Sequence, residues 1–483
     1  MYYHLIVPLL IWISVCHDFV SSFGVSLTAV QTFSKHHRHL VTTNAFQRST
    51  FRTRTASLLK ANALTTDDSL NLSPDSDALV ILGMAACSKG KLEKARGLWE
   101  DALELDMSNA AAHYQLGLLA RRRRYLSEAC TFFQRALDVE PGIDKKNNEH
   151  IRYELGTLLA EMGYFTESEA ILQDILSREP LTERPSKVKL ALANLLLDGR
   201  GMRSEALQVY NAAYQAGLTI MAFTAGVTSD SLGEHSAALE YYKKSCNEDA
   251  PDEDTALHLI VAYLREGNHD AAAILRSHLP SHVLTSLDYV LATPVAMDPS
   301  LQFFTYDMVH LALDNTCDTM EGGLVLEFGV YHGKTIRMIA SYLPNTLVHG
   351  FDTFSGIPED WHSLTPKNSY STHDKIPQAP ENVQYHVGLF SDSLPGFLND
   401  HPDKPIRFMN IDCDLYSSTK DIFDAVHGRV HPGTIIIFDE YIMNPHWKED
   451  EYKAFQEAVT EYGWEYKYLG FSLVSQQAIV QII

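Results

Sequence analysis

A repeat of 34 residues is the feature that most constrains how this chain can fold. Leu82-Gly83 recurs as Leu116-Gly117, and an alanine, an aromatic residue and a second alanine follow each glycine after 12, 16 and 19 positions. The repeated positions are Gly83, Ala95, Trp99 and Ala102, then Gly117, Ala129, Phe133 and Ala136. A period of this length is typical of helix pairs that stack, because one pair alone cannot bury its apolar face. The sequence therefore predicts an α-helical solenoid.

Weaker copies follow the first two. Leu155-Gly156 begins a third, and degenerate copies lead to a last predicted helix pair within 256–277. Pro141 and Pro180 each lie 24 residues after a glycine, where a proline would end the second helix. The pattern over 76–280 resembles the tetratricopeptide (TPR) repeat, in which small residues let two helices cross closely and an aromatic side chain fills the groove beside them.

The resemblance to TPR arrays implies a concave surface that binds a peptide or a protein partner. The alternative is a scaffold that only supports the rest of the chain. The basic run Arg121–Arg124 is compatible with an acidic peptide tail and equally with a solvated helix face. Both interpretations of the array stay open.

The first 70 residues have the composition of a targeting leader. Residues 1–20 contain an 11-residue apolar run, Leu5–Val15, which suits a signal peptide and is too short to span a bilayer. Residues 21–70 are transit-peptide-like or disordered, because Phe19–Thr66 lacks Asp and Glu and carries six Lys and Arg. We expect entry into the secretory route, with delivery to a plastid by a bipartite leader; the alternative is secretion or a Golgi location.

Charge and cysteine usage exclude several classes of function. The formal net charge is −22, which does not suit a nucleic-acid partner because phosphate binding needs a basic surface. The six cysteines are scattered and form neither a zinc-like cluster nor a disulfide framework. We expect no stable membrane span in the mature protein.

The C-terminal part changes from helical repeats to a strand-and-helix pattern. After a helix-like segment at 301–314, three apolar residues lead to Glu327, then to Gly329 and Gly333, and then to a helix. This order is typical of a buried parallel strand that turns into a helix beside a ligand. An acid followed by Gly-x-x-x-Gly favours S-adenosylmethionine (SAM) over a dinucleotide, because a pyrophosphate prefers a bare helix N-terminus.

Further strands complete the pattern. The second ends at Asp352, where doubly wound folds bind a ribose diol, and the third is followed by Asp392, a further candidate for cofactor binding. Two more strands are expected at 406–414 and 434–440, and 464–473 with 478–483 can form an antiparallel hairpin. The predicted fold is a TPR solenoid followed by an α/β doubly wound, Rossmann-like domain over 290–483.

The segments EFGVYHGKT, FDTFSGIPEDW, NIDCDLYSSTK and GTIIIFDEY, with the run Trp447–Phe455, resemble the macrocin O-methyltransferase family. That family belongs to the class I SAM-dependent methyltransferases, and the resemblance covers about 300–483. It implies metal-dependent O-methylation of sugar hydroxyls on natural products. The family's metal ligands correspond here to Asp412, Asp439 and Glu440, and Glu440 departs from the more common Asp.

Elementary chemistry agrees with this resemblance. Adjacent strands would place Asp412, Asp439 and Glu440 together, and three neighbouring carboxylates are costly without a cation. Mg²⁺ prefers such oxygen ligands. Asp412 is the expected catalytic residue, while Asp412, Asp414, His373 and His386 all stay open as proton acceptors, and the loop 360–380 is a candidate substrate lid.

The sequence predicts a SAM-dependent, Mg²⁺-assisted O-methyltransferase that acts on a vicinal hydroxyl of a small molecule, a sugar or natural product. One alternative is a protein-modifying methyltransferase whose TPR array docks the substrate. The other is a TPR adaptor with an inactive methyltransferase fold, although the intact site residues count against it.

Overall fold

The computed structural model describes residues 74–139, 148–177, 185–246, 251–316, 320, 322–362 and 365–483. The chain divides into two compact units, 1–107 and 108–483. The predicted leader segments, 1–20 and 21–70, and both repeat prolines lie outside the described residues. The domain boundaries expected from the sequence, 76–280 and 290–483, stay predictions.

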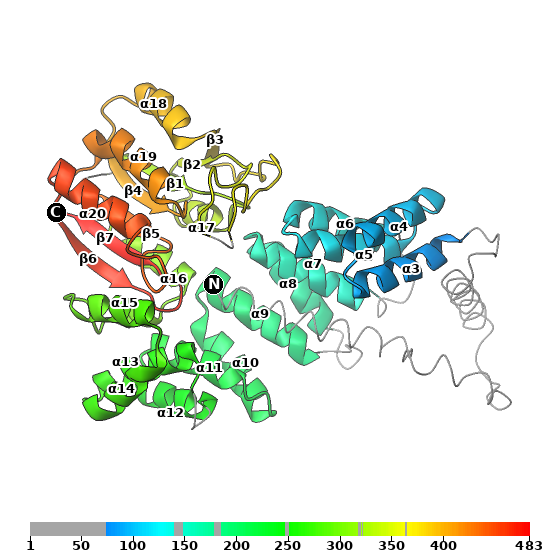
Figure 1. Ribbon diagram of the computed structural model, residues 1–483, viewed down its shortest axis with the longest axis horizontal. Coiled ribbons are helices and arrows are strands. Elements are labelled where there is room, and N and C mark those ends of the chain that lie inside the picture. The colour runs from blue at the N-terminus through cyan, green and yellow to red at the C-terminus, as the bar shows by residue number, and fades with distance from the viewer. Residues whose placement is uncertain are drawn as a thin grey trace. The chain divides into compact units, whose positions relative to one another are not determined.

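Paired helices make up the repeat region, as the sequence predicts. In the first unit α3 (Ser76–Ser88) packs on α4 (Leu92–Leu105). The second unit contains five more pairs, in which each helix packs on the next along the chain (Figure 1). They are α5 (Ala110–Arg122) with α6 (Leu126–Asp138), α7 (Glu149–Glu161) with α8 (Phe165–Leu176), α9 (Pro185–Arg200) with α10 (Arg203–Gln215), α11 (Met221–Ser231) with α12 (His235–Ser245), and α13 (Glu253–Arg265) with α14 (His269–Leu275).

The repeated glycines lie where the two helices of a pair cross. A Cβ atom added at Gly117 would lie 2.6 Å from the Phe133 ring, and one at Gly226 would lie 2.8 Å from the Tyr242 ring. In the first unit the same construction at Gly83 overlaps the Trp99 indole. The aromatic side chain therefore fills the space that the glycine leaves, which is the physical basis of the 16-residue spacing.

A seven-stranded sheet forms the C-terminal part of the second unit. Its strands are β1 (Leu324–Phe328), β2 (Val348–Asp352), β3 (Val383–Val387), β4 (Ile406–Ile411), β5 (Ile435–Phe438), β6 (Tyr466–Phe471) and β7 (Ala478–Ile482). Their order is β3-β2-β1-β4-β5-β7-β6, and β1 to β5 run parallel. The strand β7 lies antiparallel between β5 and β6, which confirms the predicted hairpin.

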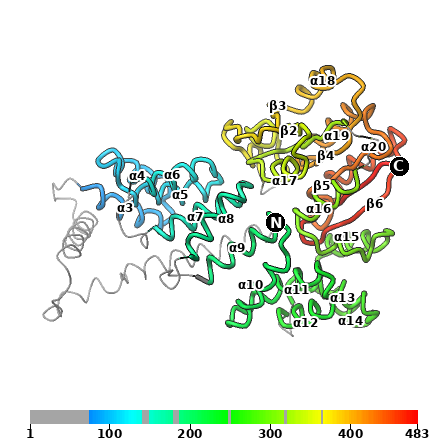
Figure 2. The backbone as a smooth tube through the Cα atoms, turned by 180° about the vertical axis from the view of Figure 1, so that it is seen from behind, coloured from blue at the N-terminus to red at the C-terminus, as the bar shows by residue number. Residues whose placement is uncertain are grey.

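Helices cover both faces of this sheet. On one face α16 (Thr305–Asp314) and α17 (Lys334–Tyr342) bury an apolar cluster that includes Val325 and Phe408. On the other face α18 (Phe390–Asp400), α19 (Tyr416–Val426) and α20 (Glu451–Tyr462) pack against Leu326 and Phe438. The helix α15 (Ser281–Leu291) joins the second face beside β6, as both views show (Figures 1 and 2). The arrangement confirms the predicted doubly wound fold.

The helix expected over 301–314 is wrong at its start. A short 3-10 turn, η2 (Pro299–Gln302), ends before Phe303, and α16 begins at Thr305. The backbone of Phe303 and Phe304 is extended. Phe303 lies under the Arg203 guanidinium, whose central carbon is 4.7 Å from the ring centroid, and Phe304 packs against two clusters of the repeat helices. Packing of these two rings therefore overrides the helical pattern.

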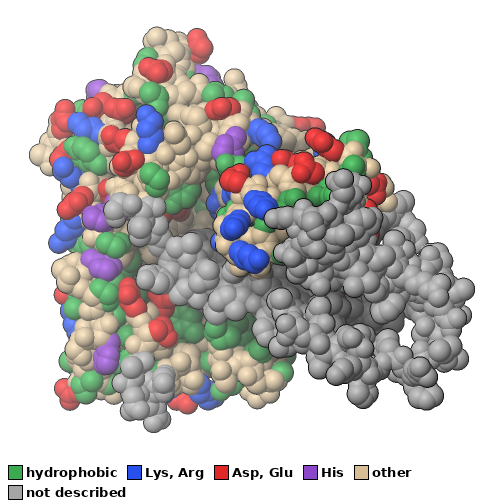
Figure 3. Space-filling model, turned by 45° about the vertical axis from the view of Figure 1, so that its right-hand side comes forward, with side chains coloured by type: hydrophobic (Ala, Val, Ile, Leu, Met, Phe, Trp, Pro, Cys, Tyr) green, Lys and Arg blue, Asp and Glu red, His purple; other side chains and the backbone are tan. Residues whose placement is uncertain are grey.

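Charges of both signs share the surface. On the face drawn in Figure 3, acidic side chains in red and basic side chains in blue are interspersed over the described part of the chain. None of the helices that the structure describes has the length and apolar character needed to cross a bilayer.

Candidate functional site

The carboxyl ends of the parallel strands bring most of the predicted site residues to one edge of the sheet. Because β4 lies between β1 and β5, the residues that follow these strands are neighbours. The backbone N–H of Asp412 donates to Phe328 O at 2.9 Å, and that of Asp439 donates to Ile411 O at 3.0 Å. Glu327 at the end of β1, Asp412 after β4 and Asp439 after β5 thus share this edge.

Backbone strain is concentrated at the same edge. Tyr331, Phe354, Asp414 and Met443 follow β1, β2, β4 and β5, and each has a positive φ between 50° and 68°. Residues other than glycine adopt this left-handed backbone conformation at a cost of about 1–3 kcal/mol, and such residues cluster at ligand-binding and active sites. Strain after four neighbouring strands marks this edge as the candidate site.

Glu327 is a deeply buried acid of the site. Its residue is 1% exposed, and one carboxylate oxygen, Oε2, has no hydrogen-bond partner among the described residues. Burial raises the pKa of Glu327 well above its usual range, and the charges of Asp439 and Asp352 raise it further. Asn410, opposite Glu327 on β4, also keeps a buried oxygen without a partner. Two such groups side by side are a place where a polar ligand can donate hydrogen bonds.

Asp352 holds the loop after β1. Its Oδ2 accepts from the backbone N–H groups of Val330 and Tyr331 at 2.8 and 2.7 Å, and its Oδ1 accepts from that of Phe354 at 2.7 Å. Burial raises the pKa of Asp352, while these backbone donors lower it. The acid that the sequence assigns to cofactor binding therefore also fixes the glycine loop, residues 329–333, to the end of β2.

The two glycines of this loop are required by protein packing. A Cβ atom at Gly329 would overlap the backbone carbonyl of Asp412, and one at Gly333 would lie 2.8 Å from an Arg337 nitrogen. Both residues have a positive φ, 88° and 82°. The sequence pattern predicts a ligand beside these glycines. In the structure the absence of a side chain at the two positions also makes room for the loop after β4 and for the first turn of α17.

The three predicted metal ligands are crowded with negative charge. Burial raises the pKa of Asp412, and Asp439 and Asp414 raise it further. Burial also raises the pKa values of Asp439 and Glu440, although the side-chain amide of Gln477 donates to Asp439 Oδ1 at 2.6 Å and lowers its pKa. Lys334, in the first turn of α17, adds a smaller compensating charge to Asp439.

Two further acids belong to this group. Burial raises the pKa of Asp414 to about 7, with Asp439 as the next cause. Glu451, the first residue of α20, is 1% exposed and its Oε2 accepts from the backbone N–H of Glu440 at 3.3 Å. Sequence reasoning missed Glu451 as a site residue, although it lies in the run Trp447–Phe455 that carries part of the family resemblance. We call these five residues the acidic cluster: Asp412, Asp414, Asp439, Glu440 and Glu451.

The donor atoms of the acidic cluster are of the kind that a hard cation binds. Its donors are carboxylate oxygens, which Mg²⁺ prefers, and the charges that raise these pKa values are those that a cation would compensate. Within the described parts of the chain, however, no group of three His, Cys, Asp or Glu side chains already stands in a geometry that would hold a metal ion. The residues fit such an ion by the type of their donor atoms alone.

A long loop, residues 353–382, contacts the site from β2. Tyr370 lies near Asp414, Glu440 and Asp412, whose charges, together with the larger effect of burial, raise its pKa. Trp361 donates from Nε1 to Asp450 Oδ2 at 3.1 Å, just before α20. The loop therefore lies beside the acidic cluster, and a lid at 360–380 stays a prediction.

The remaining candidates lie apart from the cluster. The His373 ring packs against Tyr125, with centroids 3.9 Å apart. The His386 ring stacks on Phe351 at 4.6 Å, on the face covered by α18, and burial lowers its pKa. Asp392 is exposed in the first turn of α18. No described hydrogen bond joins any of these side chains to Asp412, and the choice of proton acceptor stays a prediction.

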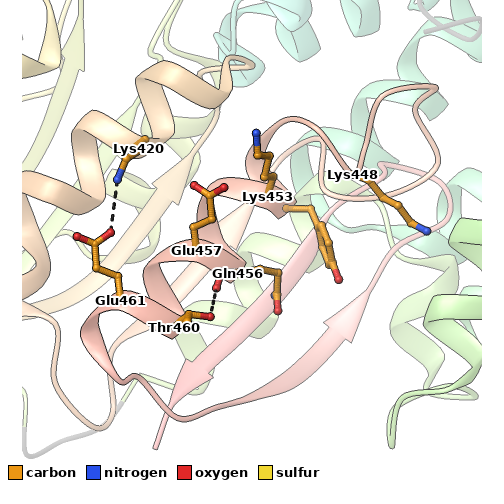
Figure 4. A pocket seen from close by; sticks show the side chains of 8 residues that line it. Lys420, Lys448, Lys453, Gln456, Glu457, Thr460 and Glu461 are labelled. Atoms are coloured by element: carbon orange, nitrogen blue, oxygen red, sulfur yellow. Dashed lines mark hydrogen bonds and ion pairs between the residues drawn. The ribbon is translucent and has the colours of Figure 1, made fainter.

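A groove on the surface of α19 and α20 is separate from this site. It has a volume of about 610 Å³ and is lined by the residues drawn in Figure 4, among them Lys420, Lys453 and Glu457. Lys420 points to Glu461, with which it forms an ion pair of 3.6 Å (Figure 4). None of the predicted site residues lines the groove.

Comparison with known proteins agrees with the site. Residues 326–441, which include the end of β1, the glycine loop, Asp352, Asp412 and Asp439, match the family model described as a methyltransferase domain. The chain contains a methyltransferase domain. This match confirms the resemblance seen in the sequence, and the paired helices form a TPR-like region before the methyltransferase domain.

Two curated relatives are O-methyltransferases. Over 153 residues the chain is 27% identical to the 8-demethyl-8-(2,3-dimethoxy-alpha-L-rhamnosyl)-tetracenomycin-C 4'-O-methyltransferase of Streptomyces olivaceus, an alignment covering 26% of this chain and 56% of the relative. Over 160 residues it is 28% identical to the demethyldecarbamoylnovobiocin O-methyltransferase of Streptomyces niveus, covering 27% and 58%. The chain thus spans little more than half the length of these relatives.

The repeat region is similar to solved TPR proteins. One is YrrB, described as a TPR protein with an unusual peptide-binding site, with a TM-score of 0.30, 24% identity, and coverage of 42% of this chain and 92% of that one. At this level of similarity no property of YrrB is carried over to the repeats that precede the methyltransferase domain.

Proposed function

We propose that this protein is a SAM-dependent O-methyltransferase that acts on a vicinal hydroxyl of a small molecule, a sugar or natural product, with Mg²⁺ at the acidic cluster. The observation that carries the proposal is the position of this cluster, which shares the carboxyl edge of the sheet with the glycine loop and with Glu327. The two relatives are both named as O-methyltransferases, one of them of a rhamnosyl-bearing compound, which supports the acceptor class.

In this proposal the glycine-loop side of the edge holds SAM, which supplies the methyl group. Glu327 and Asp352 would accept hydrogen bonds from its amino and hydroxyl groups, since carboxylates at these positions can bind both. The long loop, with Tyr370 near the cluster, would exclude water from the acceptor. Holding donor and acceptor together supplies much of the rate of such a transfer.

Asp412, Asp439 and Glu440 would hold Mg²⁺, whose charge lowers the pKa of a neighbouring hydroxyl and of the carboxylates themselves. Asp412 and Asp414 would be the residues to accept the hydroxyl proton. The crowding of buried carboxylates that raises the pKa values of both residues is the physical reason to propose a compensating cation here.

The test is incubation of labelled SAM and Mg²⁺ with a metabolite extract, with a protein extract in parallel. Methyl transfer to small molecules supports the proposal, whereas transfer only to polypeptides supports the protein-modifying alternative. We expect EDTA to abolish transfer and to leave SAM binding in place, because the proposed SAM residues and metal residues lie after different strands.

Asp439→Asn tests the metal more directly. The variant keeps the size of the side chain and removes one charge, so we expect roughly a hundredfold lower turnover and SAM affinity within about threefold. Asp421→Asn, an exposed acid on α19, is the matched control and should behave like the wild type. Near-normal turnover of both Asp439→Asn and EDTA-treated enzyme would show that the reaction needs no metal at this site.

A further inference from the structure

A buried arginine ties the glycine loop to the repeat region. Arg337, in the first half of α17, is 7% exposed. Its Nη1 donates to the backbone oxygens of His332 and Gly333 at 2.6 and 2.8 Å, and to that of Met162 at 2.8 Å. Met162 ends α7, so one nitrogen joins the glycine loop to the turn between α7 and α8.

The second terminal nitrogen extends the connection. Nη2 donates to the hydroxyl of Tyr164 at 2.7 Å and to the backbone oxygen of Gln378, in the long loop, at 2.9 Å. The central carbon of the guanidinium also lies 4.0 Å from the centroid of the Tyr164 ring, a cation–π contact. Arg337 therefore links the glycine loop, the long loop and the α7–α8 turn through one side chain.

The backbone of the turn lies directly against the start of α17. Gly163 has a φ of 81°, and a Cβ atom there would lie 2.7 Å from the Cα of Lys334. Lys334 in turn forms an ion pair with Asp198 of α9. Two successive repeat pairs thus contact the residue that follows the glycine loop.

These contacts matter because a buried guanidinium depends on its partners. Removing an acceptor from a buried charged donor costs more than the bond itself contributes, since the donor is left without water. The Arg337 charge also favours the ionised form of Glu327. A displaced arginine would therefore disturb both the loop backbone and the acid beneath it.

We propose that the α7–α8 turn, Met162–Tyr164, is a structural part of the SAM site, with Tyr164 as a positioning residue that acts through Arg337 on the glycine loop. This inference rests on the proposed function for its ligand. It means that the third repeat pair serves the methyltransferase domain directly, whatever partner the rest of the array binds.

The test uses the full chain with Tyr164→Phe, which keeps the ring and removes the hydroxyl that accepts from Arg337. We expect SAM to bind roughly fivefold to tenfold more weakly by calorimetry. The KM for SAM should rise similarly, while kcat at saturating SAM stays within about twofold, because Tyr164 does not touch the reacting atoms. Without SAM, the backbone amides of residues 331–337 should exchange hydrogen faster than in the wild type.

Tyr210→Phe is the matched control. Its hydroxyl donates to Asn194 at 2.7 Å within the repeat helices, and it has no described contact with the glycine loop. We expect wild-type SAM affinity and wild-type exchange at 331–337. Equal losses in both variants, or no change in either, would overturn the proposal. If the wild type binds no SAM, the proposed function fails, and amide exchange in Tyr164→Phe still decides whether the turn holds the loop.

Discussion

Replacing Asp352 by Asn should loosen the glycine loop. The carboxylate accepts three backbone N–H groups at 2.7–2.8 Å, two at one oxygen and one at the other. An asparagine keeps one oxygen, so its amide nitrogen must face at least one backbone donor. Each lost charge-assisted bond contributes about 1.5–3 kcal/mol, and relief of the buried charge offsets part of that loss. We therefore expect the free energy of unfolding to fall by about 2 kcal/mol.

Urea unfolding measures this loss, and calorimetry measures the affinity for SAM. We expect binding to weaken by about tenfold to a hundredfold, since the loop and the ribose partner change together. Asp421→Asn is the control: it makes the same chemical change at an exposed acid on α19 and should shift stability by no more than about 0.5 kcal/mol. If Asp352→Asn matches this control in both assays, the three hydrogen bonds do not hold the loop.

Two other predictions follow from burial and packing. The pKa of Asp414 is raised to about 7, so the metal-free folded state binds a proton at this group more tightly than the unfolded chain does. The contribution of Asp414 to thermal stability should therefore be largest below the ordinary carboxyl pKa of about 4 and should fall as the pH rises toward 7. In melting curves Asp439→Asn should reduce this dependence of stability on pH, and an unchanged dependence would contradict the charge crowding. Gly117→Ala should lower the free energy of unfolding in urea by about 1–3 kcal/mol, because the added Cβ meets the Phe133 ring. Gly97→Ala, in a helix and with open space around it, should raise the free energy of unfolding by about 0.5–1 kcal/mol. Similar effects of both variants would show that Gly117 is not required where the two helices cross.

The order of strands and helices could be predicted from the sequence because the signals are local. The apolar runs at 324–328 and 435–438 are buried along their whole length, as parallel strands covered on both faces must be. The repeat glycines could be assigned because their partners lie 16 residues away within one helix pair. The start of α16 was predicted wrongly because Phe303 packs under Arg203, and a contact between residues 100 positions apart is not visible in the local sequence pattern.

The site was predictable where it depends on strand ends. Glu327 and Asp352 lie at the ends of strands, and Asp412 and Asp439 directly follow strands, so the strand pattern places all four at one edge. Arg337 could not be found in this way, because its partners come from the repeat region and the long loop, and an arginine in an amphipathic helix is ordinary in sequence. Tertiary contacts between segments far apart in the chain decide its role.

The glycine–aromatic crossing has a consequence for how the array can evolve. Two of the repeat glycines are matched in size to a ring in their own helix pair, Gly117 to Phe133 and Gly226 to Tyr242. At Gly156 the partner is the smaller Leu172, and the clearance of an added Cβ rises to 3.1 Å. A hybrid that joined the first helix of one pair to the second helix of another would leave either a void or a clash at the crossing. Duplication or exchange of complete pairs preserves these three matches, so for them the inheritable unit of the array is the helix pair.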